Sequence, residues 1–244
     1  MSDGPWLLTD PPSPKVGDLV DLDGGESRHA AGPLRLAVGD PVVLADGLGS
    51  LFDGVMRTVS GRRCQVEIFA VRHVPKPAAQ HVDVALAVLH SQAMDWAVQK
   101  SVELGVETVL PLLAQRSQLG PRDAPGSLGH WRRVARQALK QCRRPWGLEV
   151  AEPLTIGDVI AKSRARQVVV GAHGGPHLAD LDGAVPDLLV VGPEGGFTGD
   201  ETAEMAAAGW GQLRLGRHIL RAETAAVVGA AMLVAAHDDG YAVP

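Results

Sequence analysis

Short runs of alternating hydrophobic and polar residues fill the first 74 positions of the chain. Runs such as LRLAVGD and CQVEIFAV have the length of a strand, and turn signals such as Asp46-Gly47 and Ser60-Gly61 interrupt them. The pattern predicts a small β-rich domain, and we expect its strands to form a barrel. The segment Val74-Pro75-Lys76-Pro77 favours an extended link. We therefore expect two domains, at residues 1–74 and 75–244.

Apolar strand-like runs alternate with helical patterns from His81 onward. The runs VDVALAVL, TVLPLL, QVVVGA and DLLVVG suit buried strands, and the stretches between several of them repeat their apolar residues at helical spacing. This alternation predicts an α/β domain with a mostly parallel sheet that helices cover on both faces. Gly105 is placed to cap the first helix at its C-terminus. The residues near the apolar face of that helix are Met94, Ala97, Val98, Ser101, Val102 and Leu104.

The composition is that of a globular protein with a hydrophobic core. Of the 244 residues 45% are hydrophobic and 21% are charged, values that argue against disorder. Aromatic residues make up only 4%, so Val, Leu and Ala must fill most of the core. Cys64 and Cys142 have no partner cysteine at a metal-ligand spacing, and we expect neither a disulfide nor a bound metal. The N-terminal stretch MSDGPWLLTDPP does not resemble a secretory signal, and no apolar run is long enough to span a membrane, which predicts a cytoplasmic protein.

Positive charge is concentrated in one part of an acidic chain. The net charge is −5, an unusual value for a protein that binds nucleic-acid phosphates. From Arg116 to Pro145 the one acidic residue is Asp123. The basic residues of this stretch are Arg116, Arg122, Arg132, Arg133, Arg136, Lys140, Arg143 and Arg144. A solvated helix face would explain an arbitrary cluster of charges. Because arginine predominates, and its planar guanidinium binds phosphate bidentately and stacks on bases, we interpret the stretch as an RNA-contact surface.

A glycine-rich loop follows the buried run from Leu188 to Val191. It reads Gly192-Pro193-Glu194-Gly195-Gly196, and its backbone is open enough for a flat ligand to lie against it. Thr198 and Glu201 are spaced as a capping box that would begin the next helix. The loop has neither the Lys-Ser or Lys-Thr of a P-loop nor the glycine spacing of a dinucleotide fold. Taken alone, it is equally compatible with an ordinary tight turn.

Two further turns follow strand-like runs in this half of the chain. One runs from Leu215 to Ala225, and we expect Arg221 within it to need a charged partner, either Glu223 or Glu194. The other reads Gly171-Ala172-His173-Gly174-Gly175-Pro176, and its composition alone favours an ordinary turn.

The string VGPEGGFTGDE, followed by LGRHILRAETA, closely resembles the signature of a known enzyme family. This is the SPOUT-class family of methyltransferases that modify N3 of a uridine in 16S ribosomal RNA. LRLAVGDPVVLADGLG and MDWAVQKSVELGVETVLPL resemble other parts of the same family, so that the resemblance covers nearly the whole chain. It implies a PUA-like RNA-binding barrel at residues 1–74, and at residues 75–244 a SPOUT domain that contains a deep trefoil knot.

The resemblance also implies a site for S-adenosylmethionine made by three adjoining loops. The cofactor-binding residues carried over are Ala172, His173, Val191, Gly192, Pro193, Glu194, Gly195, Gly196, Leu215, Gly216, Ile219, Leu220, Arg221 and Ala225. We expect RNA contacts at Arg28 and Arg35 as well as along the basic stretch. Family members act as homodimers, and the last helix would supply apolar contacts from Val227, Val228, Met232 and Leu233, although burial in its own core explains these residues equally well.

The implied reaction is transfer of a methyl group from the sulfonium of S-adenosylmethionine to uracil N3. The protein would align the two reactants and favour the deprotonated base. A cation near the base stabilises negative charge that develops on the ring, and Arg221 is the candidate for that role. Glu223 is the candidate for accepting the proton or for orienting Arg221. Because N3 is hidden in a base pair, the target uridine must be unpaired, in a non-canonical pair or flipped out. We expect 16S ribosomal RNA in the assembled small subunit as the partner.

Two departures from the family pattern lie outside these loops. His90-Ser91-Gln92-Ala93 stands where relatives tend to have a Lys-Gly-Asp-Arg type stretch, and Leu139 to Arg144 replaces a Glu-Gln-Ser-Gly-Arg type helix end. Two alternatives therefore stay open. One is a ribosome-assembly or RNA-binding factor that has kept the fold without catalysis, and the other is a SPOUT methyltransferase that modifies another RNA position.

Overall fold

The computed structural model describes residues 4–10, 13–76, 81–120, 123–164 and 166–237. Parts of the N-terminal stretch MSDGPWLLTDPP, together with Pro77 and Arg122, lie outside the described residues. Contacts between residues divide the chain into two compact units. The first comprises residues 1–76 and 139–147, and the second comprises residues 77–138 and 148–244. The domain bounds 1–74 and 75–244 remain a prediction. Residues 139–147 group with the N-terminal residues rather than with their neighbours in sequence.

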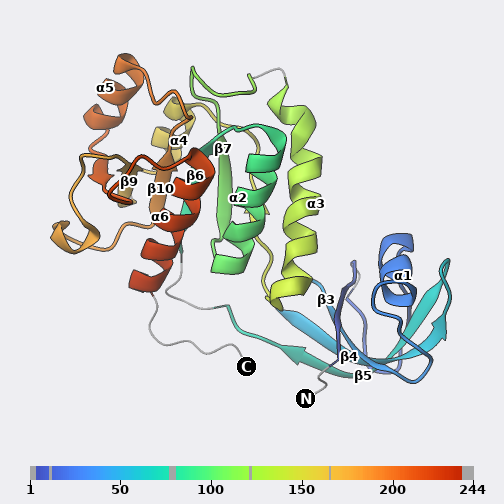
Figure 1. Cartoon of the computed structure of the whole chain (residues 1–244). Coiled ribbons are helices and arrows are strands. Elements are labelled where there is room, and N and C mark those ends of the chain that lie inside the picture. Colours follow the sequence, from blue (N-terminus) through green and yellow to red (C-terminus); the bar gives the residue numbers. More distant parts are fainter. Residues whose placement is uncertain (1–3, 11–12, 77–80, 121–122, 165, 238–244) are drawn as a thin grey trace. The chain divides into compact units, whose positions relative to one another are not determined.

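A five-stranded mixed sheet forms the N-terminal unit. Its strand order is β1-β3-β4-β5-β2, in which β1 and β3 are parallel and the other pairs are antiparallel. The helix α1 (Gly24–Ala31) belongs to the same unit (Figure 1). The strands are β1 (Trp6–Leu8), β2 (Leu19–Asp21), β3 (Pro41–Ala45), β4 (Ser50–Val59) and β5 (Cys64–His73). Their alternating residues bury a core formed by Leu7, Leu22, Ala30, Val42, Leu44, Phe52, Met56, Cys64, Val66 and Ile68.

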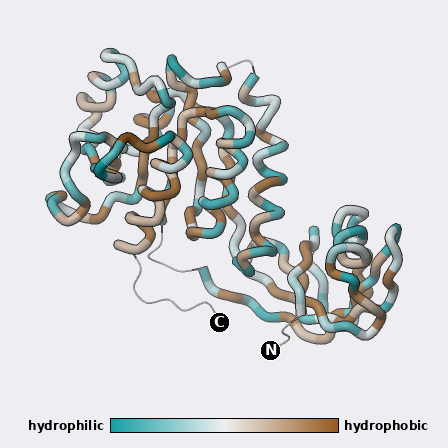
Figure 2. The backbone as a smooth tube through the Cα atoms, in the orientation of Figure 1, coloured by the Kyte–Doolittle hydropathy of each residue, from teal (hydrophilic) through white to brown (hydrophobic). Residues whose placement is uncertain are grey.

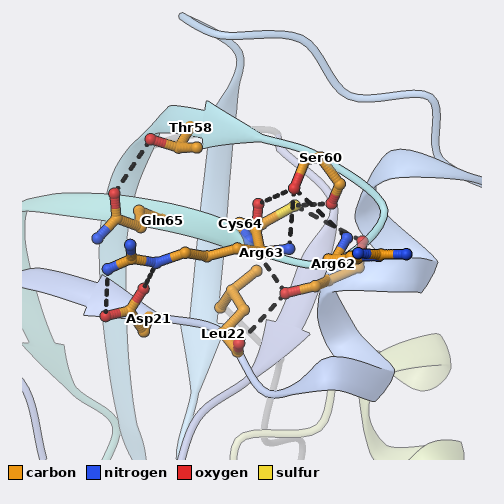
Figure 3. Close-up of polar contacts among 9 residues, drawn as sticks. Asp21, Leu22, Thr58, Ser60, Arg62, Arg63, Cys64 and Gln65 are labelled. Atoms are coloured by element: carbon orange, nitrogen blue, oxygen red, sulfur yellow. Dashed lines mark hydrogen bonds and ion pairs between the residues drawn. The ribbon is translucent and has the colours of Figure 1, made fainter.

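The turn between β4 and β5 is stabilised by side chains of the first unit (Figure 3). Ser60 donates its backbone N–H and its hydroxyl to the carbonyl of Arg63, at 3.0 and 2.8 Å. The Arg63 guanidinium in turn donates to both carboxylate oxygens of Asp21 on β2, at 2.7 and 3.2 Å. These hydrogen bonds favour the ionised carboxylate and lower the pKa of Asp21. The turn predicted at Ser60-Gly61 is confirmed.

Residues 139–147 contact the rest of the N-terminal unit through partly buried residues. The Lys140 ammonium lies 2.7 Å from Oε1 of Glu26 on α1, and the Leu8 N–H donates to the other carboxylate oxygen at 3.1 Å. The Trp146 indole N–H donates to the Val74 carbonyl at 3.1 Å. A side chain at Gly49, whose φ is +91°, would collide with the indole of Trp146, so this approach requires glycine.

A six-stranded parallel sheet forms the centre of the second unit. Its strand order is β11-β9-β10-β6-β7-β8. The strands are β6 (Asp83–Ala87), β7 (Thr108–Leu112), β8 (Glu149–Val150), β9 (Val168–Gly171), β10 (Leu188–Val191) and β11 (Gly211–Leu213). The helices are α2 (Ser91–Leu104), α3 (Ala124–Cys142), α4 (Ile156–Lys162), η1 (Leu178–Asp180), α5 (Gly199–Ala207) and α6 (Ala222–His237). The last four residues of α3 belong to the N-terminal unit.

Helices cover both faces of this sheet because the central strands are apolar on both sides. Leu188 and Val190 of β10 share a core with Ile156 and Val159 of α4 and with α5 residues. Leu189 points to the opposite face and packs against Gly229 of α6. A side chain at position 229 would collide with Leu189. On that face α2 and α6 pack against each other (Figure 1). Figure 2 shows the central strands as hydrophobic. The predicted α/β architecture with a parallel sheet is confirmed.

Local signals in the sequence locate several helix ends correctly. Gly105 ends α2 in the left-handed conformation, with φ +94°, and its N–H donates to the carbonyls of Ser101 and Val102. Thr198 and Glu201 form the predicted capping box at the start of α5. Among the described residues, no helix combines the length and the hydrophobicity that crossing a bilayer requires.

Candidate functional site

Three loops meet at the carboxyl ends of the neighbouring strands β9, β10 and β11. These strands are adjacent in the sheet, so the segments that follow them converge even though they are far apart in sequence. In open parallel sheets, ligands bind outside this edge. Residues of all three loops line one cavity with a volume of about 360 Å³, which is within the usual range for a small-molecule site.

Backbone hydrogen bonds hold the three loops in place. The Ala172 N–H donates to the Leu213 carbonyl at 2.9 Å, and the Arg214 N–H donates to the Pro176 carbonyl at 2.8 Å. These bonds connect the β9 loop to the β11 segment. The glycine-rich loop after β10 closes on itself, since the Gly196 N–H donates to the Pro193 carbonyl at 2.8 Å. These backbone hydrogen bonds fix the walls of the cavity.

Gly192 begins the glycine-rich loop directly after β10. A Cβ placed there would lie 2.8 Å from the Phe197 ring, which shows how closely the aromatic side chain covers the backbone. Gly196 has a φ of +68°, a conformation that favours glycine. The loop thus needs glycine at these two positions for separate reasons. Its open backbone and the apolar residues around it suit a flat, uncharged ring.

Most of the residues predicted to bind a cofactor line this cavity. They are Ala172, His173, Val191, Gly192, Pro193, Glu194, Gly196, Leu215, Gly216, Ile219, Leu220 and Ala225. The cavity lining does not include Gly195 or Arg221. Gly195 contributes in another way, because its carbonyl accepts a hydrogen bond from the Arg116 guanidinium at 2.7 Å. Glu194 accepts one from the Gln118 amide at 3.2 Å.

Several lining residues were not predicted from the sequence. Phe197 follows the glycine-rich loop directly, so its position beside that loop was the available signal. His218 lies within the third loop and reaches the cavity together with Ile219. Gly171 and Ala222 belong to the two further turns noted in the sequence. The others come from elements whose position relative to the cavity no local pattern gives, and they are Val170, Thr202, Met205, Ala206, Trp210, Gly211 and Gln212.

The two candidate catalytic residues lie beside the cavity rather than in its lining. Arg221 is exposed, so water can solvate its charge. The expectation that Arg221 needs Glu223 or Glu194 as a partner was therefore wrong, because α6 begins only at Ala222 and leaves Arg221 at the surface. Glu223 is partly buried, and its Oε2 is buried with no hydrogen-bond partner among the described residues.

Exposed arginines of the second unit lie along α3 and near the glycine-rich loop. Arg133 and Arg136 are exposed on α3, as is Arg116 beside Gly195. Arg132 is also exposed, but its guanidinium donates to the Val150 carbonyl at 3.0 Å and lies 3.4 Å from the Glu152 carboxylate. These residues leave a positive surface on the outward side of the helix.

The remaining candidate RNA-binding residues belong to the N-terminal unit. Arg28, Arg35 and Arg143 are exposed, whereas Arg144 is partly buried. The Lys140 side chain is only 10% exposed and is paired with Glu26, so it offers little surface to a phosphate. We therefore leave Lys140 out of the set of RNA contacts that we propose below.

Comparison with known proteins identifies the family. The family model for the RNA methyltransferase domain matches residues 76–234. The chain belongs to the RNA methyltransferase family. Ribosomal RNA small subunit methyltransferase E of Mycobacterium tuberculosis is 32% identical over 226 residues, a match that covers 88% of this chain and 86% of that protein. The same-named protein of Aquifex aeolicus is 31% identical and covers 86% and 92% of the two chains. The resemblance to this family seen in the sequence is confirmed.

Solved structures extend the similarity from the domain to the whole chain. Ribosomal RNA small subunit methyltransferase E of Neisseria gonorrhoeae, bound to S-adenosylmethionine, is 26% identical and superposes with a TM-score of 0.83. That alignment covers 94% of this chain and 96% of the other. A Legionella pneumophila protein described as a methyltransferase, also in complex with S-adenosylmethionine, is 26% identical with a TM-score of 0.86 and covers 96% and 98%. This methyltransferase family member thus shares its fold with two proteins that bind the same cofactor.

Proposed function

We propose that this protein transfers a methyl group from S-adenosylmethionine to 16S ribosomal RNA of the small subunit. The observation that carries the proposal is the cavity formed by the three loops, within a fold shared with two S-adenosylmethionine complexes. The residues fit the cofactor, since the cavity is lined by glycine backbone and by apolar side chains such as Val191 and Leu220. Its lining holds no Lys or Arg among the described residues, as expected for a ligand without phosphate.

The proposed acceptor is N3 of a specific uridine. S-adenosylmethionine supplies an electrophilic methyl group on a good leaving group, so the protein has to align the acceptor and favour loss of its proton. Arg221, which is exposed beside the cavity, is placed to stabilise negative charge on the uracil ring. Glu223 lies two residues after Arg221, in the first turn of α6, and its Oε2 has no hydrogen-bond partner among the described residues, so we assign it the role of orienting Arg221 when RNA is bound. We expect Arg221→Ala to lose most of its turnover and Glu223→Gln to lose a smaller part of it.

The whole-chain similarity supports a finer description of the two units. We propose that residues 1–74 form a PUA-like RNA-binding barrel and that residues 75–244 form a SPOUT domain with a trefoil knot. The segment from β11 to α6 runs past the loops after β9 and β10, and α6 then packs on β6 and β10 in the middle of the sheet. A chain that leaves the edge of a sheet and returns to its centre past such loops is consistent with a knot. Knots are rare in proteins.

The proposed partner is 16S ribosomal RNA in the assembled small subunit, which implies a cytoplasmic protein. The contacts would come from Arg28, Arg35, Arg116, Arg132, Arg133, Arg136, Arg143 and Arg144. We also propose a homodimer in which α6 contributes to the interface. Val227, Val228 and Met232 are partly exposed on this helix, whereas Leu233 is fully buried in its own core.

The deciding experiment measures methyl transfer from labelled S-adenosylmethionine to small subunits that lack their own N3-methyluridine. Free 16S ribosomal RNA is tested in parallel, and the modified nucleoside is identified by mass spectrometry. We expect N3-methyluridine on the assembled subunits. A different methylated nucleoside would contradict the N3 assignment. Binding of S-adenosylmethionine without transfer to any RNA would instead favour a factor that has kept the fold without catalysis.

A further inference from the structure

The cavity has three titratable side chains among its lining residues, namely His173, Glu194 and His218. Methylation at N3 of uracil replaces a proton, so some group or the solvent has to take that proton. Arg221 cannot do so, since an arginine stays protonated in proteins. Neither Arg221 nor Glu223 belongs to the cavity lining. The proton acceptor is therefore expected among the three titratable side chains that line the cavity.

The surroundings of these three side chains separate their roles. Glu194 already accepts a hydrogen bond from Gln118. His173 lies on the loop after β9, which continues toward the acidic residues Asp180 and Asp182. Those carboxylates repel RNA phosphates. His218 lies instead between two exposed arginines, Arg217 and Arg221, so the third loop is the one of the three whose charge attracts an RNA strand.

Ile219 adds an independent sign that the third loop faces a substrate. The residue is 87% exposed although it lines the cavity, and it is the most exposed of the large hydrophobic residues in the described part of the chain. Exposure of an apolar side chain to water is unfavourable, and a flat ring that covers the side chain lowers the free energy. His218 precedes Ile219 directly in the chain and lines the same cavity, so a uracil that lies on Ile219 would have His218 close by.

We propose that His218 is the general base that removes the N3 proton and that Ile219 forms the apolar platform for the target uracil. This inference rests on the proposed function. A neutral imidazole nitrogen of His218 takes the N3 proton, and the N3 electron pair forms the bond to the methyl carbon. The carbon–sulfur bond breaks, its electrons remain on sulfur to give S-adenosylhomocysteine, and the imidazolium afterwards releases its proton to water. Imidazole suits this task because it ordinarily changes charge between about pH 5 and pH 8.

Charged groups near His218 come from each surrounding segment. Arg217 and Arg221 lie on its own loop, and the Arg214 guanidinium donates to the Gly216 carbonyl at 3.3 Å. His173 and Glu194 line the same cavity from the loops after β9 and β10.

The test compares pH profiles of kcat/KM for methyl transfer by the wild-type protein and by His218→Asn. The wild-type rate should rise with pH through the imidazole range and then level off. His218→Asn should be slower by about 10²–10⁴-fold on this plateau, and its rate should keep rising at higher pH as hydroxide replaces the base. The matched control is His177→Asn, an exposed histidine outside the cavity lining, which should keep the wild-type profile. Calorimetry should show that His218→Asn loses much less affinity for S-adenosylmethionine than it loses in rate.

Three results would overturn the assignment. If His218→Asn keeps the wild-type pH profile, His218 is not the base. If His173→Asn loses that profile instead, His173 is the base. Full activity in His218→Arg would show that a cation rather than a base is needed there. The platform is tested by Ile219→Ser, for which we expect the KM for RNA to rise by a larger factor than the Kd for S-adenosylmethionine. If the wild-type protein itself transfers no methyl group, the proposed function fails rather than this assignment.

Discussion

Gly192 illustrates how a single residue shapes the proposed cofactor site. The sequence indicated that the loop after β10 needs an open backbone, and the structure adds the reason at this position. The Phe197 ring covers the glycine so closely that a methyl group would lie 2.8 Å from it. A Gly192→Ala variant therefore has to displace the ring or the loop. Both sit at the cavity, so the effect should appear in ligand binding.

We expect Gly192→Ala to weaken S-adenosylmethionine binding by about tenfold, which corresponds to about 1.4 kcal/mol and lies within the usual cost of overpacking. Isothermal titration calorimetry of the full chain measures the change. Gly199→Ala is the matched control, because a Cβ at this first position of α5 has no neighbour within 4 Å. Equal affinities of the two variants would show that the backbone at Gly192 does not contact the cofactor.

The exposure of Arg221 could not be predicted from its neighbours in the sequence. Its position between Leu220 and Ala222 suggested burial, because both neighbours are apolar. The side chain is exposed, since the loop turns into α6 at this point and only Ala222 faces the core. Burial depends on the direction of the chain at a helix start, and that direction follows from tertiary packing.

At the scale of helices and strands, local patterns were reliable and distant pairings were not. The end of α2 at Gly105 and the capping box of α5 were both predicted, because all the interacting groups lie within a few residues. Lys140 was assigned to an RNA surface from its basic neighbours. In the structure it lies against Glu26, which is 114 positions away in sequence. A pairing of that separation has no local signal.

The pair of Lys140 and Glu26 should therefore stabilise the N-terminal unit. Lys140→Met leaves the Glu26 carboxylate, whose side chain is 3% exposed, without its counter-ion. We expect a loss of about 3–5 kcal/mol in the free energy of unfolding, measured by urea denaturation of the full chain. The double variant Glu26→Gln/Lys140→Met should recover part of this loss, because an amide oxygen can still accept the hydrogen bond from the Leu8 N–H.

A surface ion pair provides the comparison for Lys140. Lys100 lies 2.8 Å from Glu103 on α2, where the two side chains are 31% and 27% exposed. Lys100→Met should cost less than about 1 kcal/mol. A similar small cost for Lys140→Met would mean that solvent reaches Glu26 in the folded protein, and the buried pair would then have no special role.

For the whole molecule, the class of architecture followed from the sequence but the spatial arrangement did not. Alternating strand and helix patterns predicted a parallel sheet, and the structure confirms it. The order β11-β9-β10-β6 brings three loops together, yet hydrophobic patterning carries no information on which strands are neighbours. For the same reason Trp210 and Met205 were missed as cavity residues. The resemblance to a known family, rather than periodicity, indicated that the three loops form one site.

Charge over the whole molecule leads to a prediction about RNA binding. The net charge of −5 repels RNA at long range, so affinity has to come from local positive surfaces such as the outward side of α3. An arginine that binds a phosphate releases a counter-ion, and its removal lowers the slope of log affinity against log salt concentration by about one. Arg133→Ala should therefore weaken binding to 16S ribosomal RNA and reduce this slope by about one.

The control for this variant removes the same charge elsewhere. Arg164 is exposed in the same unit but lies outside the proposed RNA-contact set, and Arg164→Ala should leave the slope unchanged. Fluorescence anisotropy at several salt concentrations measures both variants. If both lower the affinity equally, the RNA responds to total charge and α3 is an ordinary solvated face. If only Arg133→Ala changes the slope, a phosphate lies against α3 in the complex, and the acidic remainder of the surface then disfavours other orientations of the RNA.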